Sequence, residues 1–124
     1  MRKLRIWLAA GLLGGVLACN TPSVPLPPPD LPSLGFLSAG VGEVELQGAA
    51  DPQHADARFY VFNLSNGEGV ITTAAADGSF TTGAFAGKEG DRAQIYYDLP
   101  TGDRSQDVCV TLRIAAPLLS TTCD

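Results

Sequence analysis

The single histidine of the chain, His54, lies between two carboxylates in the segment Asp51-Pro-Gln-His-Ala-Asp56. Histidine and carboxylate side chains together can hold a metal ion or act as general acids and bases. A zinc site needs three or four ligands, however, and the sequence has no second histidine. A Ser-His-Asp triad would also depend on His54, and no Gly-x-Ser-x-Gly motif presents a serine. We therefore predict that His54 lies in an exposed loop between strands and has no catalytic role.

Two other aspartates, Asp77 and Asp91, could form a carboxylate pair or bind calcium together with Asn66 and Glu68. Each of the two stands next to a glycine, and such pairs are typical of tight turns. Turn formation explains both aspartates without a ligand. The sequence therefore predicts no metal site, no cofactor and no catalytic residue.

Three tyrosines, Tyr60, Tyr96 and Tyr97, could offer a stacking surface for a sugar. Consecutive residues of a strand point to opposite faces of a sheet, so we expect one of Tyr96 and Tyr97 to be exposed. One exposed ring does not form a platform, and the tyrosines alone predict no carbohydrate site.

The N-terminus has the pattern of an export signal. Arg2, Lys3 and Arg5 precede an apolar run over residues 6–17, which small residues follow. The run has about a dozen residues, whereas a transmembrane helix needs roughly 20. A buried N-terminal helix is the alternative, but the later sequence contains no amphipathic helix to pack against it. We predict a signal peptide over residues 1–18.

Removal of this segment makes the remaining chain strongly acidic. Five Lys and Arg residues then face thirteen Asp and Glu residues, and the formal charge changes from −5 to −8. Nucleic acids and anionic lipids both attract basic proteins. The acidic residues are scattered, as on a solvated surface. We therefore expect no nucleic-acid partner and no electrostatic attraction to anionic lipid.

The end of the signal, Val16-Leu17-Ala18-Cys19, resembles the lipobox of bacterial lipoproteins. That pattern has an aliphatic residue, a tolerant position, a small residue and then cysteine, and Leu17 stands where Ala or Ser is more common. The resemblance implies lipidation of the Cys19 thiol, cleavage after Ala18 and acylation of the new N-terminus. An ordinary secretory signal with an incidental cysteine is the alternative.

This resemblance also implies where the protein is anchored. Each buried CH₂ contributes about 0.8 kcal/mol, so two or three acyl chains hold a protein stably on a bilayer without a membrane-spanning segment. Asn20 follows the cysteine at the position where lipoproteins of the inner membrane typically carry Asp. The resemblance thus implies a lipid anchor in the outer membrane.

Cys109 and Cys123 are the two cysteines that remain beside Cys19. An even pair in an exported protein indicates a disulfide, which would contribute about 3 kcal/mol by closing a loop of about 15 residues. The apolar residues that alternate with Cys109 point to the other face, so we expect its sulfur outside the core, covered by the tail after Pro117. Two free thiols are the alternative, and metal binding by two thiols alone is a weaker one.

A proline-rich segment follows the lipobox. Six of the nine prolines lie within residues 22–32, and proline lacks the N–H that helices and central strands require. Extended polyproline II would give a semi-rigid spacer of roughly 35–40 Å. A ligand for an SH3-type domain is the alternative, but such domains are not expected in a bacterial envelope. We predict a lipidated N-terminus and tether over residues 19–35.

The rest of the chain alternates short β-like runs with turn residues, and no run of ten residues has a helical period. Strands are predicted over residues 43–48, 58–64, 70–73, 79–82, 92–97 and 107–115, with a hairpin at Asp77-Gly78. The pattern predicts an all-β antiparallel sandwich of six or seven strands over residues 36–124. The expected core consists of Phe59 or Tyr60, Val61 or Phe62, Ile71, Phe80, Ile95, Val110 and Leu112.

The order of these motifs resembles bacterial immunoglobulin-like and carboxypeptidase-regulatory-like modules. The resemblance covers most of residues 40–115 and is carried by Phe59-Tyr-Val-Phe-Asn63, Thr73-Ala-Ala-Ala-Asp-Gly-Ser-Phe80 and Gly90-Asp91. It implies an immunoglobulin-like sandwich that acts as a spacer, stalk or recognition surface and has no active site.

The sequence therefore predicts a bacterial cell-envelope protein, lipid-anchored through Cys19, that displays a non-enzymatic immunoglobulin-like domain. Its role would be structural or in recognition, with another envelope protein or a glycan as partner. The alternative is a surface lipoprotein that binds a carbohydrate or calcium through its loops.

Overall fold

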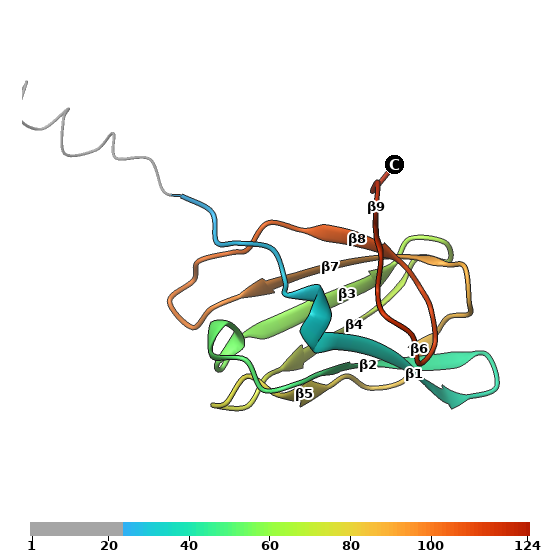
Figure 1. Ribbon diagram of the computed structural model, residues 1–124, viewed down its shortest axis with the longest axis horizontal. Coiled ribbons are helices and arrows are strands. Elements are labelled where there is room, and N and C mark those ends of the chain that lie inside the picture. Colours follow the sequence, from blue (N-terminus) through green and yellow to red (C-terminus); the bar gives the residue numbers. More distant parts are fainter. Residues whose placement is uncertain (1–23) are drawn as a thin grey trace, which may run out of the picture.

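The structure is a computed structural model that describes residues 24–124, so the predictions for the signal peptide and for Cys19 lie outside the described residues. The described chain forms two antiparallel sheets packed face to face, which confirms the predicted all-β sandwich (Figure 1). Within residues 24–124, no helix is long and apolar enough to cross a membrane.

The structure contains nine strands and two short 3₁₀ helices over these residues. The strands are β1 (Leu34–Gly40), β2 (Glu43–Gly48), β3 (Arg58–Asn63), β4 (Glu68–Thr73), β5 (Phe80–Thr81), β6 (Phe85–Ala86), β7 (Arg92–Asp98), β8 (Val108–Thr111) and β9 (Ser120–Thr121). The 3₁₀ helices are η1 (Leu31–Ser33) and η2 (Pro52–His54).

The smaller sheet has the order β1-β2-β5, and β6 also pairs with β2; the larger sheet has the order β4-β3-β7-β8-β9. The described part of the chain thus contains nine strands, more than the expected six or seven. The additional strands are β1, β6 and β9. β1 contains glycine and serine, which lower strand propensity, and β6 and β9 have two residues each, which is too short to show a period.

The predicted hairpin at Asp77-Gly78 is wrong. β4 pairs with β3 and β5 pairs with β2, so the segment between them crosses from one sheet to the other. The turn itself is present, because Asp77 Oδ1 accepts hydrogen bonds from the backbone N and the Oγ of Ser79 at 3.0 and 2.6 Å. Gly78 has a φ of +88° and packs directly against the backbone of Asp51, where a Cβ would collide. The turn is therefore packed against the segment that leads into η2, where Asp51 N also donates a hydrogen bond of 2.9 Å to Asp77 O.

The core lies between the sheets and contains most of the expected residues. Ile71 is the exception: its side chain is 58% exposed. β4 is the outermost strand of its sheet, and Ile71 is paired with Tyr60 on the face that points away from the core. The expected residues that are buried are Phe59, Val61, Phe80, Ile95, Val110 and Leu112.

The later part of the proline-rich segment lies against the sandwich (Figure 1). Leu26 accepts a hydrogen bond from Gln106 N at 3.0 Å, and its own N–H donates to Arg104 O at 3.3 Å. The Tyr97 hydroxyl donates to Pro27 O at 3.1 Å. From Leu26 onward this segment is thus attached to the domain.

Candidate functional site

The candidate site is the outer face of the larger sheet, where the two central strands β3 and β7 expose aromatic rings. Side chains alternate along both strands. Phe59 and Tyr97 are buried in the core, whereas Tyr60 and Tyr96 are partly exposed on the outer face. As expected, Tyr96 and Tyr97 point to opposite faces, and Tyr96 is the partly exposed one.

Tyr60 and Tyr96 face each other across the two strands and stack. Their ring centroids are 4.7 Å apart and their planes differ by 11°. The Arg104 guanidinium lies 4.9 Å from the Tyr96 centroid and 5.6 Å from that of Tyr60, within the range of cation–π attraction. Sequence analysis predicted a single exposed tyrosine ring, whereas the structure has two that stack. The sequence alone does not show that Tyr60 and Tyr96 are cross-strand partners.

Arg104 is held over the rings by a bidentate ion pair with Asp98. Its Nε donates to Asp98 Oδ1 at 2.7 Å, and its Nη2 donates to Oδ2 at 3.0 Å. These hydrogen bonds lower the pKa of Asp98 and raise the pKa of Arg104. Both groups thus stay charged, and the guanidinium is fixed beside the aromatic pair.

Phe62 extends this surface toward the end of β3. It is paired with Gly69 on β4 and with Gln94 on β7. A Cβ added to Gly69 would lie 2.7 Å from Phe62 Cδ1, so the ring lies directly over the glycine. Its side chain is 38% exposed. Ile71 lies on the same outer face, paired with Tyr60. We call these outward-facing residues, Tyr60, Phe62, Tyr96 and the aliphatic Ile71, the aromatic face.

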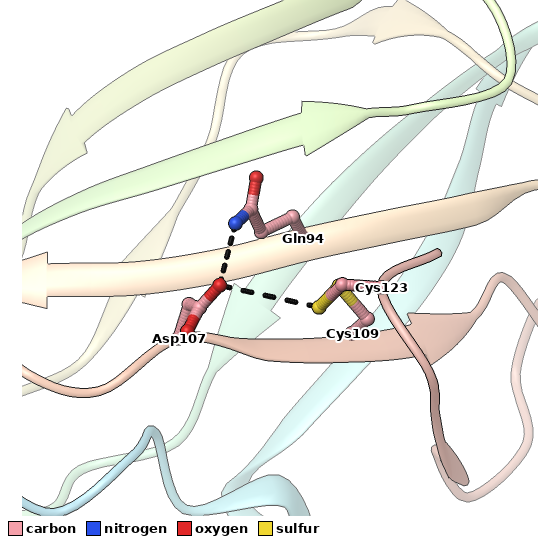
Figure 2. The surroundings of a disulfide bond; sticks show 4 residues. All are labelled: Gln94, Asp107, Cys109 and Cys123. Atoms are coloured by element: carbon pink, nitrogen blue, oxygen red, sulfur yellow. Dashed lines mark hydrogen bonds between the residues drawn. A yellow bond between two sulfur atoms is a disulfide. The ribbon is translucent and has the colours of Figure 1, made fainter.

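A hollow of about 490 Å³ lies beside the aromatic face. Phe62 and Tyr96 line it from the sheet, together with Gln94, and the segment 104–107 forms its opposite wall. Gln94 Nε2 donates a hydrogen bond of 2.6 Å to Asp107 Oδ2, which links the sheet to that wall (Figure 2). The site therefore combines aromatic rings with an amide, a carboxylate and a guanidinium.

The predicted disulfide between Cys109 and Cys123 is present next to this hollow. Cys109 is paired with Gln94 in the sheet, and Cys123 Sγ lies 4.0 Å from Asp107 Oδ2 (Figure 2). Cys109 points away from the inter-sheet core, as expected, and is buried because the disulfide and the C-terminal strand β9 cover it. The bond thus fixes the chain end beside Asp107.

His54 is fully buried, so the prediction of an exposed loop is wrong. Asp51 caps the 3₁₀ helix η2 by accepting a hydrogen bond from Gln53 N at 2.9 Å, and this turn directs His54 inward. The imidazole contacts Phe59 and Tyr97 edge-on, with centroids 4.9 and 5.1 Å away. Burial lowers the pKa of His54, so the ring is neutral at pH 7. The single turn of η2 gives no periodic signal that could have revealed this burial.

The neutral ring helps to hold the proline-rich segment. Its Nε2 accepts a long hydrogen bond of 3.5 Å from the backbone N–H of Asp30, which places the ring proton on Nδ1. Asp51 Oδ2 is 4.0 Å from that nitrogen. His54 therefore serves the packing of the segment 24–33 against the domain.

The four residues considered as metal ligands, Asp77, Asp91, Asn66 and Glu68, form hydrogen bonds that hold loops of the domain in place. Asp91 is buried and accepts a hydrogen bond of 2.8 Å from Asn63 Nδ2. Asn66 and Glu68 bond to the backbone of β6 at 3.0 and 3.2 Å, while Asp77 lies in the turn between β4 and β5. In the described part of the chain, no three His, Cys, Asp or Glu side chains come together as metal ligands would.

Comparisons of the chain with protein-family models, with curated proteins and with solved structures found no match. The function is therefore inferred from the chain's own residues. Of these, the aromatic face and the hollow beside it present the most distinctive combination of exposed side chains.

Proposed function

We propose that this protein is a lipid-anchored bacterial envelope protein whose immunoglobulin-like sandwich is a recognition domain and not an enzyme. The observation that carries the proposal is the aromatic face. Apolar patches rimmed by polar groups mark interaction sites, and binding hot spots are enriched in Tyr, Trp and Arg. Here Tyr60 and Tyr96 stack beside Arg104, and Phe62 and Ile71 are exposed next to them.

The outer faces of the two sheets differ, which supports one of them as the contact surface. The outward-facing side chains of β2 in the smaller sheet are Glu43, Glu45 and Gln47, all polar. Such residues are depleted in the centre of protein interfaces, whereas aromatic residues and Arg are enriched there. The aromatic face is therefore the surface with which we expect a partner to bind.

The membrane anchor is supported by the residues before the domain. Arg2, Lys3 and Arg5, the apolar run and the lipobox favour a lipid on Cys19 in the outer membrane. If Cys19 carries the lipid and Leu26 is attached to the domain, the intervening chain spans at most about 25 Å. This reach is shorter than the spacer expected from the full proline-rich segment. The domain would then be displayed close to the bilayer surface.

The anchor is tested by fractionation of cells that express the full-length chain. We expect Cys19→Ala to lose the lipid and the cleavage after Ala18, and so to leave the fraction of processed, detergent-extractable membrane protein. Cys123→Ala is the matched control and should keep the lipid, because its sulfur belongs to the disulfide of the folded domain. An unchanged fractionation and mass of Cys19→Ala would contradict the lipoprotein assignment.

The recognition surface is tested by photo-crosslinking in intact cells. A photoreactive residue at Ile71, on the aromatic face, should give discrete adducts that shift the mass of the protein. The same residue at Gln47, on the outer face of the smaller sheet, is the control and should give none of these adducts. Equal adducts from both positions would contradict recognition through the aromatic face, and no adduct from Ile71 would exclude a protein partner that covers this residue.

Calcium binding is not proposed as a second function. Asn66, Glu68 and Asp91, the residues considered for it, already make hydrogen bonds within the domain. No observation on the described residues favours it over the aromatic face.

A further inference from the structure

We propose that the hollow beside the aromatic face binds a neutral saccharide. This inference rests on the proposed recognition function and deepens it, because it names the chemical class of the ligand. It is carried by three properties of the hollow: its combination of side chains, its balance of charge and the rigidity of its wall.

The side chains of the hollow match the two kinds of surface that a sugar presents. A sugar ring has an apolar C–H face and a rim of hydroxyl groups that both donate and accept hydrogen bonds. Phe62 and Tyr96 supply aromatic carbon, and Gln94 and Asp107 supply an amide and a carboxylate within the same hollow. Small-molecule sites typically combine an apolar lining with a few fixed polar groups in a volume of about 300–1,000 Å³. The hollow of about 490 Å³ falls within this range but is open to solvent, so a bound sugar would stay partly exposed.

The charges around the hollow favour a neutral ligand over an ionic one. Arg104 and Asp107 line it with opposite charges, and Arg104 is already paired with Asp98. A charged ligand would meet a like charge as well as an opposite one. Hydroxyl groups, in contrast, can donate to Asp107 and accept from Arg104, because a guanidinium has five N–H donors and Asp98 uses two of them.

The wall of the hollow is fixed before a ligand arrives. The buried Ser105 accepts a hydrogen bond from Tyr97 N at 2.9 Å through its Oγ. Its own backbone N–H donates to Tyr97 O at 2.8 Å, and Leu26 bonds to the residues on both sides of it. The bond between Gln94 and Asp107 ties the same wall to the sheet (Figure 2). Binding therefore requires little ordering of side chains, which is the main cost that preorganised sites avoid.

A protein partner is the competing occupant of this region. Stable protein interfaces bury about 800 Å² on each side, and such a partner would have to cover Ile71 as well as the hollow. A saccharide in the hollow leaves Ile71 uncovered, since this residue is not among those that line it. The two occupants therefore predict different crosslinking from a photoreactive residue at position 71.

The test is titration calorimetry of the full-length lipidated protein in detergent micelles. The probes are glucose, galactose, mannose and N-acetylglucosamine, each as a monomer and a short oligomer. We expect saturable one-site binding of at least one probe, weakened tenfold or more by Phe62→Ala and by Gln94→Ala. Gln47→Ala, on the outer face of the smaller sheet, is the control and should leave the affinity unchanged. Melting temperatures near that of the wild type show that each variant is folded.

A second variant tests the ring position without removing the ring. Gly69→Ala places a methyl group under Phe62 Cδ1 and must displace the ring, so we expect it to weaken binding while the rest of the hollow is kept. Binding that survives Phe62→Ala, Gln94→Ala and Gly69→Ala together would overturn the assignment of the hollow.

The saccharide inference and the recognition function can fail separately. If no probe binds while the crosslinks from Ile71 persist, the saccharide proposal is overturned and recognition of a protein stands. If no probe binds and the crosslinks are also absent, both are overturned.

Discussion

The strands β3 and β7 carry two neighbouring aromatic pairs with opposite environments. Phe59 and Tyr97 face each other on the inner side of the sheet, and Tyr60 and Tyr96 face each other one residue further along on the outer side. The inner pair is buried with His54, and Phe59 also stacks on Phe80 at a centroid distance of 4.1 Å. The outer pair is accompanied by the charged Arg104.

The difference shows that one register places one aromatic pair in the core and leaves the other for the recognition that we propose. Because side chains alternate, a shift of one residue would move each pair to the opposite face. The inner pair removes its apolar area from water and stabilises the sandwich. The outer pair contributes less to stability, and its exposed area remains available to a ligand. Substitutions in the inner pair should therefore lower the free energy of unfolding, whereas substitutions in the outer pair should change it much less.

The largest expected effect is the loss of the inner aromatic ring. Phe59→Ala should lower the free energy of unfolding by about 3–5 kcal/mol, because the cavity in a closed core cannot collapse fully. Tyr60→Ala, on the outer face, should cost about 0.5–1 kcal/mol, as expected for a cross-strand pair at the surface. Urea denaturation at pH 7 measures both values. Similar costs for the two variants would contradict the division of roles between the pairs.

Reduction of the disulfide should have the next largest effect. The bond closes a loop between residues 14 positions apart, and loss of that constraint should lower the free energy of unfolding by about 3 kcal/mol. Urea denaturation with and without a reductant measures it. The double variant Cys109→Ala, Cys123→Ala is the control and should not respond to the reductant.

Removal of the Tyr97 hydroxyl should have a smaller effect and a local one. The hydroxyl donates to Pro27 O and accepts a hydrogen bond of 3.0 Å from Gln53 Nε2, so Tyr97→Phe should cost about 1 kcal/mol. It should also speed amide exchange at Gln106, whose N–H is bonded to Leu26. Tyr96→Phe, on the outer face, is the matched control. Unchanged exchange in Tyr97→Phe would mean that this hydroxyl does not hold the proline-rich segment.

Acidification should give the smallest effect near neutral pH. Burial lowers the pKa of His54 in the folded state below its usual value of 6.5. The unfolded chain therefore binds a proton first as the pH falls, and stability decreases from about pH 6.5 down to the lowered pKa. The pKa of Asp98 is lowered as well, but a carboxylate is protonated only at more acidic pH, so Asp98 does not change the stability in this interval.

The pH effect is measured by the unfolding free energy between pH 7 and pH 5, with His54→Gln as the comparison. The variant should lose most of the slope in this interval because it removes the titrating group. A slope that persists unchanged in His54→Gln would assign the pH dependence to other groups.

The sequence predicted the fold class because strand alternation and turn residues are local signals. It could not decide between Phe59 and Tyr60 as the inward residue, since β3 is apolar on both faces and only pairing with β7 settles the orientation. The exposure of Ile71 was also not predictable, because its outward direction follows from its pairing with Tyr60 on the outer face of the sheet. The burial of His54 could not be predicted, because a single turn of 3₁₀ helix is too short to show a hydrophobic period.

The candidate site was less predictable than the fold. Arg104 and Asp107 come from the connection between β7 and β8, and nothing local indicates that they reach Tyr96 and Gln94. A glycine opposite an aromatic residue, as in Gly69 and Phe62, becomes visible only when the register of β3 and β4 is known. The attachment of the proline-rich segment depends on backbone hydrogen bonds and on a hydroxyl that is remote in sequence. These contacts leave no pattern in the sequence around the prolines.

The attachment of Leu26 beside Ser105 has a mechanical consequence. Leu26 forms a parallel bridge with Ser105, so a pull on a lipidated Cys19 would be transmitted first to this bridge and not to the core. The bridge adjoins the wall of the hollow, where Arg104 and Gln106 hold Leu26 by two backbone hydrogen bonds. Tension between the membrane and a bound partner would therefore load the wall of the hollow before it loads the sandwich.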